Sequence, residues 1–456
     1  MKALVLLSSL GVISLLAELF SFKKLLYPIV LLGLIATFIF NIQDWNAANN
    51  TFYNMLQFDN YAIAFSSVII LVAFLWFLMA EGFFKEETNM TDHYSLVLFA
   101  LVGAIILTSY TNMTMLFLGI EILSIPMYIL VGSSKNDLSS NEASFKYLIM
   151  GAFATGFLLF GIALIYGATG SFDLATIKTG ISVQGATPTI FYVGMLMMLV
   201  GLSFKVSAVP FHFWAPDVYE GAPTVITAFM ATIVKLAAFA AFLRLFDVTF
   251  FRVSASWMNI VWVLAALTML VGNITAVFQT RTKRMLAYSS VAHAGYMLMA
   301  LLAMNTYSNS AILFYGLAYS IGSIATFTIV SIVAEARGDD GIHAFNGLGK
   351  SNPLLAVVMS IALLSLAGIP PTAGFFAKYV IFTSSFLAGN VFLVAVAILA
   401  SLIGVYYYFR LIIAMYFKEG NSEKINIEMN HKLLLIVVAI AIIALGIFPD
   451  FVIRLI

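Results

Sequence analysis

The sequence predicts an all-α integral membrane protein with about fourteen transmembrane helices. Of its 456 residues, 62% are hydrophobic and only 9% are charged, and the mean hydropathy is +1.04. No soluble core needs that much apolar surface. Apolar runs long enough to cross about 30 Å of hydrocarbon recur along the whole chain, which leaves little room for a soluble domain.

Each of the fourteen runs is predicted to form one helix. The first lacks a small-residue cleavage site, so we interpret it as a retained helix and not as a signal peptide. The twelfth is too long for one straight crossing. The runs cover residues 3–20, 25–41, 61–81, 94–110, 112–132, 143–167, 189–209, 223–246, 257–278, 286–304, 309–335, 353–388, 390–416 and 432–455.

Basic residues outside the runs predict the orientation, because cytoplasmic loops hold the excess of lysine and arginine. Alternate loops carry most of these residues, among them Lys23, Lys24, Lys135, Lys283 and Arg284. Both termini are therefore expected on the opposite side, which in a bacterium is the periplasm. The predicted location is the bacterial inner membrane, crossed many times.

Composition excludes several classes of site. A net charge of +1 without a basic tail gives no reason to expect nucleic acid as a partner. The absence of cysteine excludes disulfides, thiolate zinc sites and Cys-ligated iron–sulfur clusters. Five scattered histidines and no glycine-rich phosphate loop leave no visible haem, flavin, nucleotide or metal site. Electrons, if the protein serves a redox enzyme, are expected to travel in other chains.

Two predicted helices are interrupted in the same manner. The seventh run is interrupted by Pro210, and the twelfth is interrupted by residues 368–374, which read Gly-Ile-Pro-Pro-Thr-Ala-Gly. Proline removes a backbone donor and clashes one turn back, and glycine permits unwinding, so each site is predicted to be a broken helix. Paired interrupted segments at matching positions of two halves point to the ion site of a transporter.

The two breaks also predict an internal repeat. They lie five helices apart, and an odd offset places them in segments of opposite orientation. Helices 4 to 8 and 9 to 13 are therefore expected to form two inverted five-helix repeats. The predicted domains are residues 1–93 with helices 1 to 3, residues 94–246 and 257–417 with the two repeats, and residues 432–456 with helix 14.

Four ionisable residues lie deep inside apolar runs and are the first candidates for an ion path: Glu121, Lys205, Lys235 and Lys378. A charge at bilayer depth costs about 3 kcal/mol on insertion scales, so such residues usually mark an ion or substrate path. The alternatives are structural. Glu121 and Lys205 could form an ion pair that only locks helix packing, and Lys378 could neutralise the exposed carbonyls of a broken helix.

Three further candidates have weaker signals. Lys146 is about one turn into helix 6, where it could reach the membrane surface. His212 follows the first break, and His293 lies in helix 10; both suit proton relay, although each could be a packed core histidine. Asp217 and Glu220 are expected in a solvated loop. Hydroxyls such as those of Ser207, Tyr288, Ser289 and Ser290 more often bond their own backbone than carry protons.

Four segments resemble a known family: residues 201–239, residues 118–128, residues 142–147 and residues 367–378. The first contains Phe-Lys-Val-Ser-Ala-Val-Pro-Phe-His-Phe-Trp, and the last contains Gly-Ile-Pro-Pro-Thr-Ala-Gly-Phe-Phe-Ala-Lys. Together they resemble the subunit N family of the proton-translocating NADH-quinone oxidoreductase, respiratory complex I. One departure is Val225, where this family commonly has a second proline.

The resemblance implies a fold of the antiporter-like membrane subunits and a set of roles. Glu121 and Lys205 would form the pair of one half-channel, Lys235 would continue the central polar axis, and Lys378 would lead outward. It also implies no cofactor in this chain, with quinone, flavin and iron–sulfur clusters in other subunits. The implied partners are the other membrane-arm subunits of complex I and the lipid bilayer.

Two other classes stay open at this point. A stand-alone secondary transporter would use the same broken helices, but it should have a roomier substrate site with more hydrogen-bonding side chains. A subunit of a multi-subunit cation/proton antiporter or of a membrane-bound hydrogenase would share the same ancestry. The scarcity of carboxylates beyond Glu121 argues against Na⁺, which prefers hard oxygen ligands.

Overall fold

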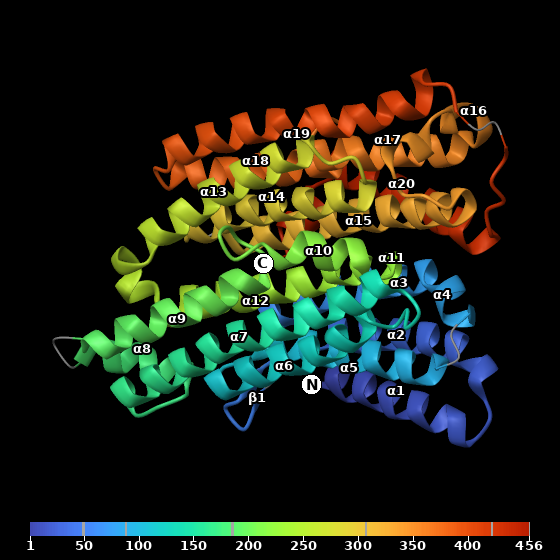
Figure 1. The fold of residues 1–456 in the computed structure, drawn as a ribbon. Helices are drawn as coiled ribbons and strands as arrows, with labels where there is room; N and C mark the ends of the chain where they lie inside the picture. The colour runs from blue at the N-terminus through green and yellow to red at the C-terminus, as the bar shows by residue number, and fades with distance from the viewer. Residues whose placement is uncertain (48–50, 87–88, 184–186, 306–307, 421–422, 456) are drawn as a thin grey trace.

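Long helices follow one another along the whole chain and pack side by side in the computed structural model (Figure 1). It describes all residues except 48–50, 87–88, 184–186, 306–307, 421–422 and 456. The N-terminal helices lie along one edge of the bundle and the C-terminal helices along the other, with α9 to α12 between them. The all-α membrane fold predicted from the sequence is confirmed.

Every predicted run corresponds to helix in the structure. The long helices are α1 Lys2–Leu19, α2 Leu26–Gln43, α3 Asn60–Met79, α5 Met90–Ser109, α6 Met113–Val131, α7 Leu138–Thr169, α9 Thr189–Lys205, α13 Met258–Val277, α14 Thr282–Ala303, α15 Ser308–Arg337, α17 Pro353–Ala367, α18 Ala373–Leu387, α19 Val391–Phe417 and α20 Met429–Ile447. The eighth run is divided into α11 Thr224–Phe229, the π-helix η2 Met230–Val234, α12 Lys235–Arg244 and the π-helix η3 Leu245–Thr249.

Short elements connect these helices. They are η1 Lys23–Leu25, α4 Glu81–Glu86, α8 Leu174–Val183, α10 Trp214–Gly221, η4 Phe251–Ser256, η5 Ile342–Phe345, α16 Leu348–Ser351 and α21 Asp450–Ile453. An antiparallel hairpin pairs β1 Thr51–Phe52 with β2 Leu56–Gln57, in the register Thr51 to Gln57 and Phe52 to Leu56. The loops predicted to be basic lie at the end of the bundle that holds α4 and α16, which we call the basic end (Figure 1).

Local chemistry explains where the helix boundaries differ from the predicted ones. The side chain of Asp137 accepts a hydrogen bond from the Ser139 amide at 2.9 Å, so α7 begins at Leu138 and not at residue 143. Such an N-cap satisfies one of the free amides of the first turn. At the C-terminal end of the chain, Pro449 follows α20, which ends at Ile447, and α21 begins after it.

Both predicted breaks are present. Helix α9 ends at Lys205 and α10 begins at Trp214, while α17 ends at Ala367 and α18 begins at Ala373. The indole of Trp214 donates to the Phe204 carbonyl at 3.0 Å, which satisfies a backbone group that the first break leaves free.

The centre of the bundle is formed by the helices that are most completely enclosed. In the 18-residue apolar windows of these spans, all residues of Thr224–Thr249, 94% of those of α14 and 89% of those of α15 are buried, against 33% in α1 and α20. By length and composition, twelve helices of the described residues could cross a membrane, and three shorter apolar helices, α9, α17 and α18, belong to the two interrupted passes. The total of fourteen crossings and the inversion of the two five-helix sets stay predictions.

Candidate proton-transfer site

Lys205 lies at the point where α9 ends, and its side chain is buried with 6% exposure. Its ammonium donates to the hydroxyl of Ser124 on α6. The rings of Tyr128 and Tyr147 lie close by, with centroids 5.9 and 5.8 Å from the Lys205 Nζ atom. The lysine is therefore held by one hydroxyl and two aromatic faces.

Glu121 lies on the same helix, one turn before Ser124, and is partly buried. Its charge acts on Lys205, but no ion pair joins these two described residues. The direct contact is made instead by Ser124, about 4.5 Å further along α6. Glu121 and Lys205 thus interact through their charges without a direct contact. A single water molecule that joins the two side chains stays a prediction.

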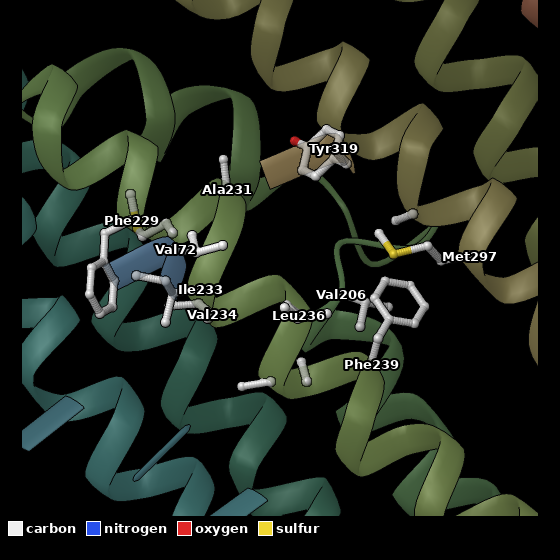
Figure 2. Close-up of a cluster of buried hydrophobic side chains, with 14 of the residues drawn as sticks. Val72, Val206, Phe229, Ala231, Ile233, Val234, Leu236, Phe239, Met297 and Tyr319 are labelled. Carbon is white, nitrogen blue, oxygen red and sulfur yellow. The ribbon is translucent and has the colours of Figure 1, made fainter. Parts of the chain in front are cut away.

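Lys235 is the first residue of α12, directly after the π-helix η2, and only 2% of it is exposed. Its Nζ atom donates to the Ser290 carbonyl at 2.6 Å and also to the Ser290 hydroxyl. Apolar side chains of four other segments converge on this helix, from Val72, Val206, Met297 and Tyr319 (Figure 2). This helix is therefore packed among apolar side chains, and Ser290 supplies the polar contacts of the Lys235 ammonium.

Lys378 lies on α18, just after the second break, with 6% exposure. Its ammonium donates to the Ala367 carbonyl at 2.7 Å and to the Ser401 hydroxyl at 2.8 Å. Since Ala367 is the last residue of α17, the lysine caps the negative end of that helix. Lys378 thus does contact a carbonyl of the broken helix, as its structural interpretation required. The Ser401 hydroxyl beside it is a second group to which the ammonium can pass a proton.

The three lysines share one feature that matters chemically. In the part of the chain that the structure describes, each is bonded to hydroxyl or carbonyl oxygens and none to a carboxylate. A hydroxyl accepts from an ammonium and donates to a neutral amine, so either form of the lysine keeps a partner. Such a site can release a proton without leaving a buried polar atom unsatisfied.

His293 lies between Lys235 and Lys378. Its Nδ1 atom is 2.6 Å from the Tyr315 hydroxyl, and its Nε2 atom is 3.2 Å from the Tyr408 hydroxyl. A small cavity is lined by His293, Tyr319 and Lys378, and the Tyr319 ring centroid is 5.8 Å from the Lys235 Nζ atom. His293 therefore lies near both lysines, and its role in proton relay stays a prediction.

Lys146 and His212 stand apart from this group. Lys146 lies at the basic end with 39% exposure and forms ion pairs with Glu142 at 2.7 Å and Asp217 at 2.8 Å. His212 is 5% exposed beside Phe213, and its Nδ1 atom has no hydrogen-bond partner among the described residues. The structure thus groups Glu121 with Lys205, and His293 with Lys235 and Lys378, and leaves Lys146 and His212 outside both groups.

The prediction that Asp217 and Glu220 lie in a loop was wrong, although their side chains keep 36% and 22% exposure. Both lie on α10 and pair with Arg284 of α14, at 3.0 and 2.6 Å. Burial raises the pKa of Asp217, but hydrogen bonds from Lys146 and Arg284 outweigh it and hold that pKa below its usual value. The sequence of this segment is typical of a polar loop, so it did not indicate an eight-residue helix whose acidic residues pair with an arginine of another helix.

Sequence reasoning missed most of the hydroxyl groups around the lysines. They are Ser124, Tyr128, Tyr147, Tyr315, Tyr319, Ser401 and Tyr408. A tyrosine in a membrane helix resembles any interfacial aromatic residue, so the composition did not indicate that these tyrosines lie near the lysines. The usable signal was spacing, because Tyr315 and Tyr319 are four residues apart and share one face of α15.

Comparison with known proteins shows the family to which the chain belongs. The family described as "NADH:quinone oxidoreductase/Mrp antiporter, TM" matches residues 110–404. NADH-quinone oxidoreductase subunit N of Cytophaga hutchinsonii is 48% identical, over 100% of this chain and 99% of that protein. The chain belongs to the NADH-quinone oxidoreductase subunit N family. Subunit N of Flavobacterium psychrophilum is 44% identical, over 100% of both proteins.

Solved structures agree with the subunit N fold. A chain of respiratory complex I from Thermus thermophilus with bound aureothin is 31% identical, with a TM-score of 0.85 over 99% of this chain and 98% of that one. A chain of the membrane-bound sulfane sulfur reductase, an archaeal respiratory membrane complex, is 27% identical, with a TM-score of 0.88 over 100% and 96%. A chain of the Mrp complex from Dietzia sp. is only 20% identical, with a TM-score of 0.89 over 100% and 95%, and shows the fold alone. The resemblance seen in the sequence is confirmed.

Proposed function

We propose that this subunit N chain translocates protons across the membrane, in a complex whose other subunits reduce quinone. The observation that carries the proposal is the set of buried lysines, each hydrogen-bonded to uncharged oxygens. A lysine used only for structure would be expected to have a carboxylate partner, because an unpaired charge in a low-dielectric interior is costly. These lysines instead keep the means to lose and regain a proton.

Glu121 and Lys205 act first in this scheme. A carboxylate that approaches Lys205 stabilises the ammonium, and one that withdraws favours loss of the proton. The energy required is modest, because exporting one charge against about 150 mV takes about 3.5 kcal/mol. A change in the distance between Glu121 and Lys205 is therefore enough to drive one transfer, and it is supplied by conformational change elsewhere in the complex.

Lys235, His293 and Lys378 continue the path towards the other side. The contacts of His293 with Tyr315 and Tyr408 lie between the two lysines, so the polar groups form a series along the membrane plane. Helices 4 to 8, residues 94–246, and helices 9 to 13, residues 257–417, would each contribute one half of the series as inverted repeats. The basic end faces the cytoplasm and both termini face the periplasm.

The chain acts within a larger assembly. Its partners are the other membrane-arm subunits and the surrounding lipid, and the bilayer is the bacterial inner membrane. Flavin, iron–sulfur and quinone chemistry belong to those other subunits in this proposal. The chain contributes the path for protons and takes its energy from the redox reaction.

The decisive experiment replaces Lys205 in the assembled complex. Lys205→Ala should lower both quinone-coupled turnover and proton pumping in proteoliposomes while the complex still assembles, because the change removes a buried charge and creates none. Lys205→Arg should fail as well, since a guanidinium cannot deprotonate at accessible pH. Lys135→Ala, an exposed lysine at the basic end, is the matched control.

The arginine variant separates two roles. Normal pumping by Lys205→Arg would mean that the residue acts only as a fixed positive charge, and the proton-carrier role would be wrong. Replacement of H⁺ by Na⁺ in the same vesicles tests the antiporter-like alternative. Transport of Na⁺ in step with quinone reduction would contradict the proposal.

A further inference from the structure

His293 belongs to a chain of hydrogen-bonded side chains that come from three helices. Its Nδ1 atom is 2.6 Å from the Tyr315 hydroxyl on α15, and its Nε2 atom is 3.2 Å from the Tyr408 hydroxyl on α19. The Tyr408 hydroxyl also bonds the hydroxyl of Ser289 on α14. All four side chains are buried, with at most 4% exposure. Hydrogen bonds therefore connect Ser289 with Tyr315 through Tyr408 and His293, without a gap.

The hydroxyl of Ser289 is used differently from most hydroxyls in membrane helices. Such a hydroxyl commonly bonds a carbonyl of its own helix, as that of Thr232 does with the Ala228 carbonyl at 2.7 Å. Among the described residues, the Ser289 hydroxyl instead bonds that of Tyr408, on another helix, and either oxygen can be the donor. Ser289 can therefore give a proton to Tyr408 or take one from it.

The chain can hold its hydrogen atoms in two arrangements while the heavier atoms stay in place. A neutral imidazole has one N–H donor and one acceptor nitrogen. When Nδ1 of His293 carries the proton, it donates to Tyr315, and Nε2 accepts from Tyr408. When Nε2 carries the proton, every hydrogen bond points the other way. A change from the first arrangement to the second moves one proton from the Ser289 end to the Tyr315 end.

We propose that Tyr408 is a proton-transfer residue, which takes protons from Ser289 and gives them to His293. The inference deepens the proposed function and rests on it. A proton that reaches the Ser289 oxygen displaces the hydroxyl's own proton to the Tyr408 oxygen. The Tyr408 proton passes to Nε2, the Nδ1 proton passes to the Tyr315 oxygen, and the Tyr315 proton leaves. One O–H bond forms at Ser289 and one breaks at Tyr315, so each group keeps its number of protons.

Each end of the chain lies beside one of the buried lysines. Ser289 precedes Ser290, whose carbonyl and hydroxyl accept from the Lys235 ammonium, and Lys235 is the donor at this end. Tyr315 and Lys378 line the same small cavity, and the neutral amine of Lys378 takes up the proton at the other end. The net change is one N–H bond broken at Lys235 and one formed at Lys378.

Tyr408 differs from its neighbour Tyr407 in its hydrogen-bond partners. Both residues are 1% exposed, and their ring centroids are 4.4 Å apart. The Tyr407 hydroxyl donates to the side-chain oxygen of Asn273 at 3.1 Å. A carboxamide does not gain and lose protons as an imidazole does, so this contact holds α19 against α13 without offering a route for protons. The two tyrosines therefore provide a matched pair for experiment.

The test is Tyr408→Phe in the assembled complex, which removes one hydroxyl and keeps the ring, with Tyr407→Phe as the control. We expect Tyr408→Phe to lower pumping and quinone-coupled turnover by about tenfold or more, since positioned proton-transfer groups contribute at least factors of that size. Tyr407→Phe should pump at the native rate per assembled complex. The solvent deuterium isotope effect on turnover should rise in Tyr408→Phe alone, because proton transfer then limits the rate.

A second variant breaks the same chain one step away. Ser289→Ala should slow pumping as Tyr408→Phe does, and the double variant should be no slower than the slower single variant. Groups that act as one unit show such non-additive losses, because the first change already interrupts the transfer. When Ser289→Ala is combined with Tyr407→Phe, the two effects should instead be independent.

The other outcomes count against the inference. Tyr408→Phe that pumps as fast as Tyr407→Phe would overturn it, as would a slow variant with an unchanged isotope effect or a double variant whose losses multiply. If less complex assembles but each assembled complex pumps normally, the Tyr408 hydroxyl is structural and the inference is wrong. Normal pumping by Lys205→Ala would contradict the proposed function as a whole, whereas normal pumping by Tyr408→Phe alone contradicts only this inference.

Discussion

Gly374→Ala is predicted to disturb the second break more than any conservative change of its size elsewhere in that segment. Gly374 is the second residue of α18, and its amide donates to the Ser365 hydroxyl at 3.1 Å. A Cβ atom at this position would lie 1.8 Å from the Ser365 carbonyl oxygen and 2.6 Å from its carbon. Both atoms belong to the backbone of α17, so no side chain can swing aside.

The size of the effect follows from that distance. Real Cβ contacts stay beyond 3.0 Å, so α17 and α18 must separate by about 1.2 Å. Overpacking of this kind costs about 1–3 kcal/mol, and a backbone clash lies at the upper end. The shift also acts on the Lys378 contact with the Ala367 carbonyl, which spans the two helices at 2.7 Å. Turnover should therefore fall together with stability.

The assay is the thermal stability of the purified complex, followed with its quinone-coupled turnover. Gly156→Ala in α7 is the control, because a Cβ atom there meets nothing within 4 Å and alanine favours a helix by about 1 kcal/mol. We expect Gly374→Ala to be destabilised and slow, and Gly156→Ala to be at least as stable as the native protein. Native stability and turnover in Gly374→Ala would refute the steric reasoning.

Two further predictions concern ion pairs. Asp59→Ala should destabilise the complex by about 3 kcal/mol, because Arg244, 6% exposed and 2.6 Å from the Asp59 carboxylate, loses its partner; a thermal shift equal to that of an exposed substitution would contradict this. Asp217 has a pKa held below its usual value by Lys146 and Arg284, so its stabilisation is complete above the unfolded pKa of about 3.9 and is lost as the pH falls through the folded value. The difference in thermal stability between the native protein and Asp217→Asn should therefore stay constant from about pH 8 to 5 and shrink below about pH 4; a difference that instead grew on acidification would show that the sign is wrong.

Much of the fold could be predicted because each signal was local. A run of apolar residues is a helix in lipid, where the backbone has no other partner. Pro210 and the stretch 368–374 broke their helices as expected, since a missing amide cannot be supplied by packing. Lys205 and Lys235 stood out because a lone charge in an apolar run has few harmless explanations.

The contacts of those residues could not be predicted, because they depend on which helices meet. Ser124 lies on α6 and Lys205 on α9, and nothing within either segment fixes their relative height. The role of α10 was hidden for the same reason: Asp217 reads as a loop residue until Arg284 is known to lie opposite it. Which side chains of different helices meet depends on how the helices pack, and a single sequence does not show this packing directly.

The π-helices on either side of α12 have a consequence for which way its side chains face. A π turn holds one residue more than an α turn, so it rotates everything that follows by about 100° relative to a continuous helix. Residues four apart across η2 Met230–Val234 therefore do not share a face, and Thr224–Phe229 and Lys235–Arg244 present different sides to their neighbours. Were the extra residue absent, Lys235 would be turned by about 100° and would lose its contacts with Ser290.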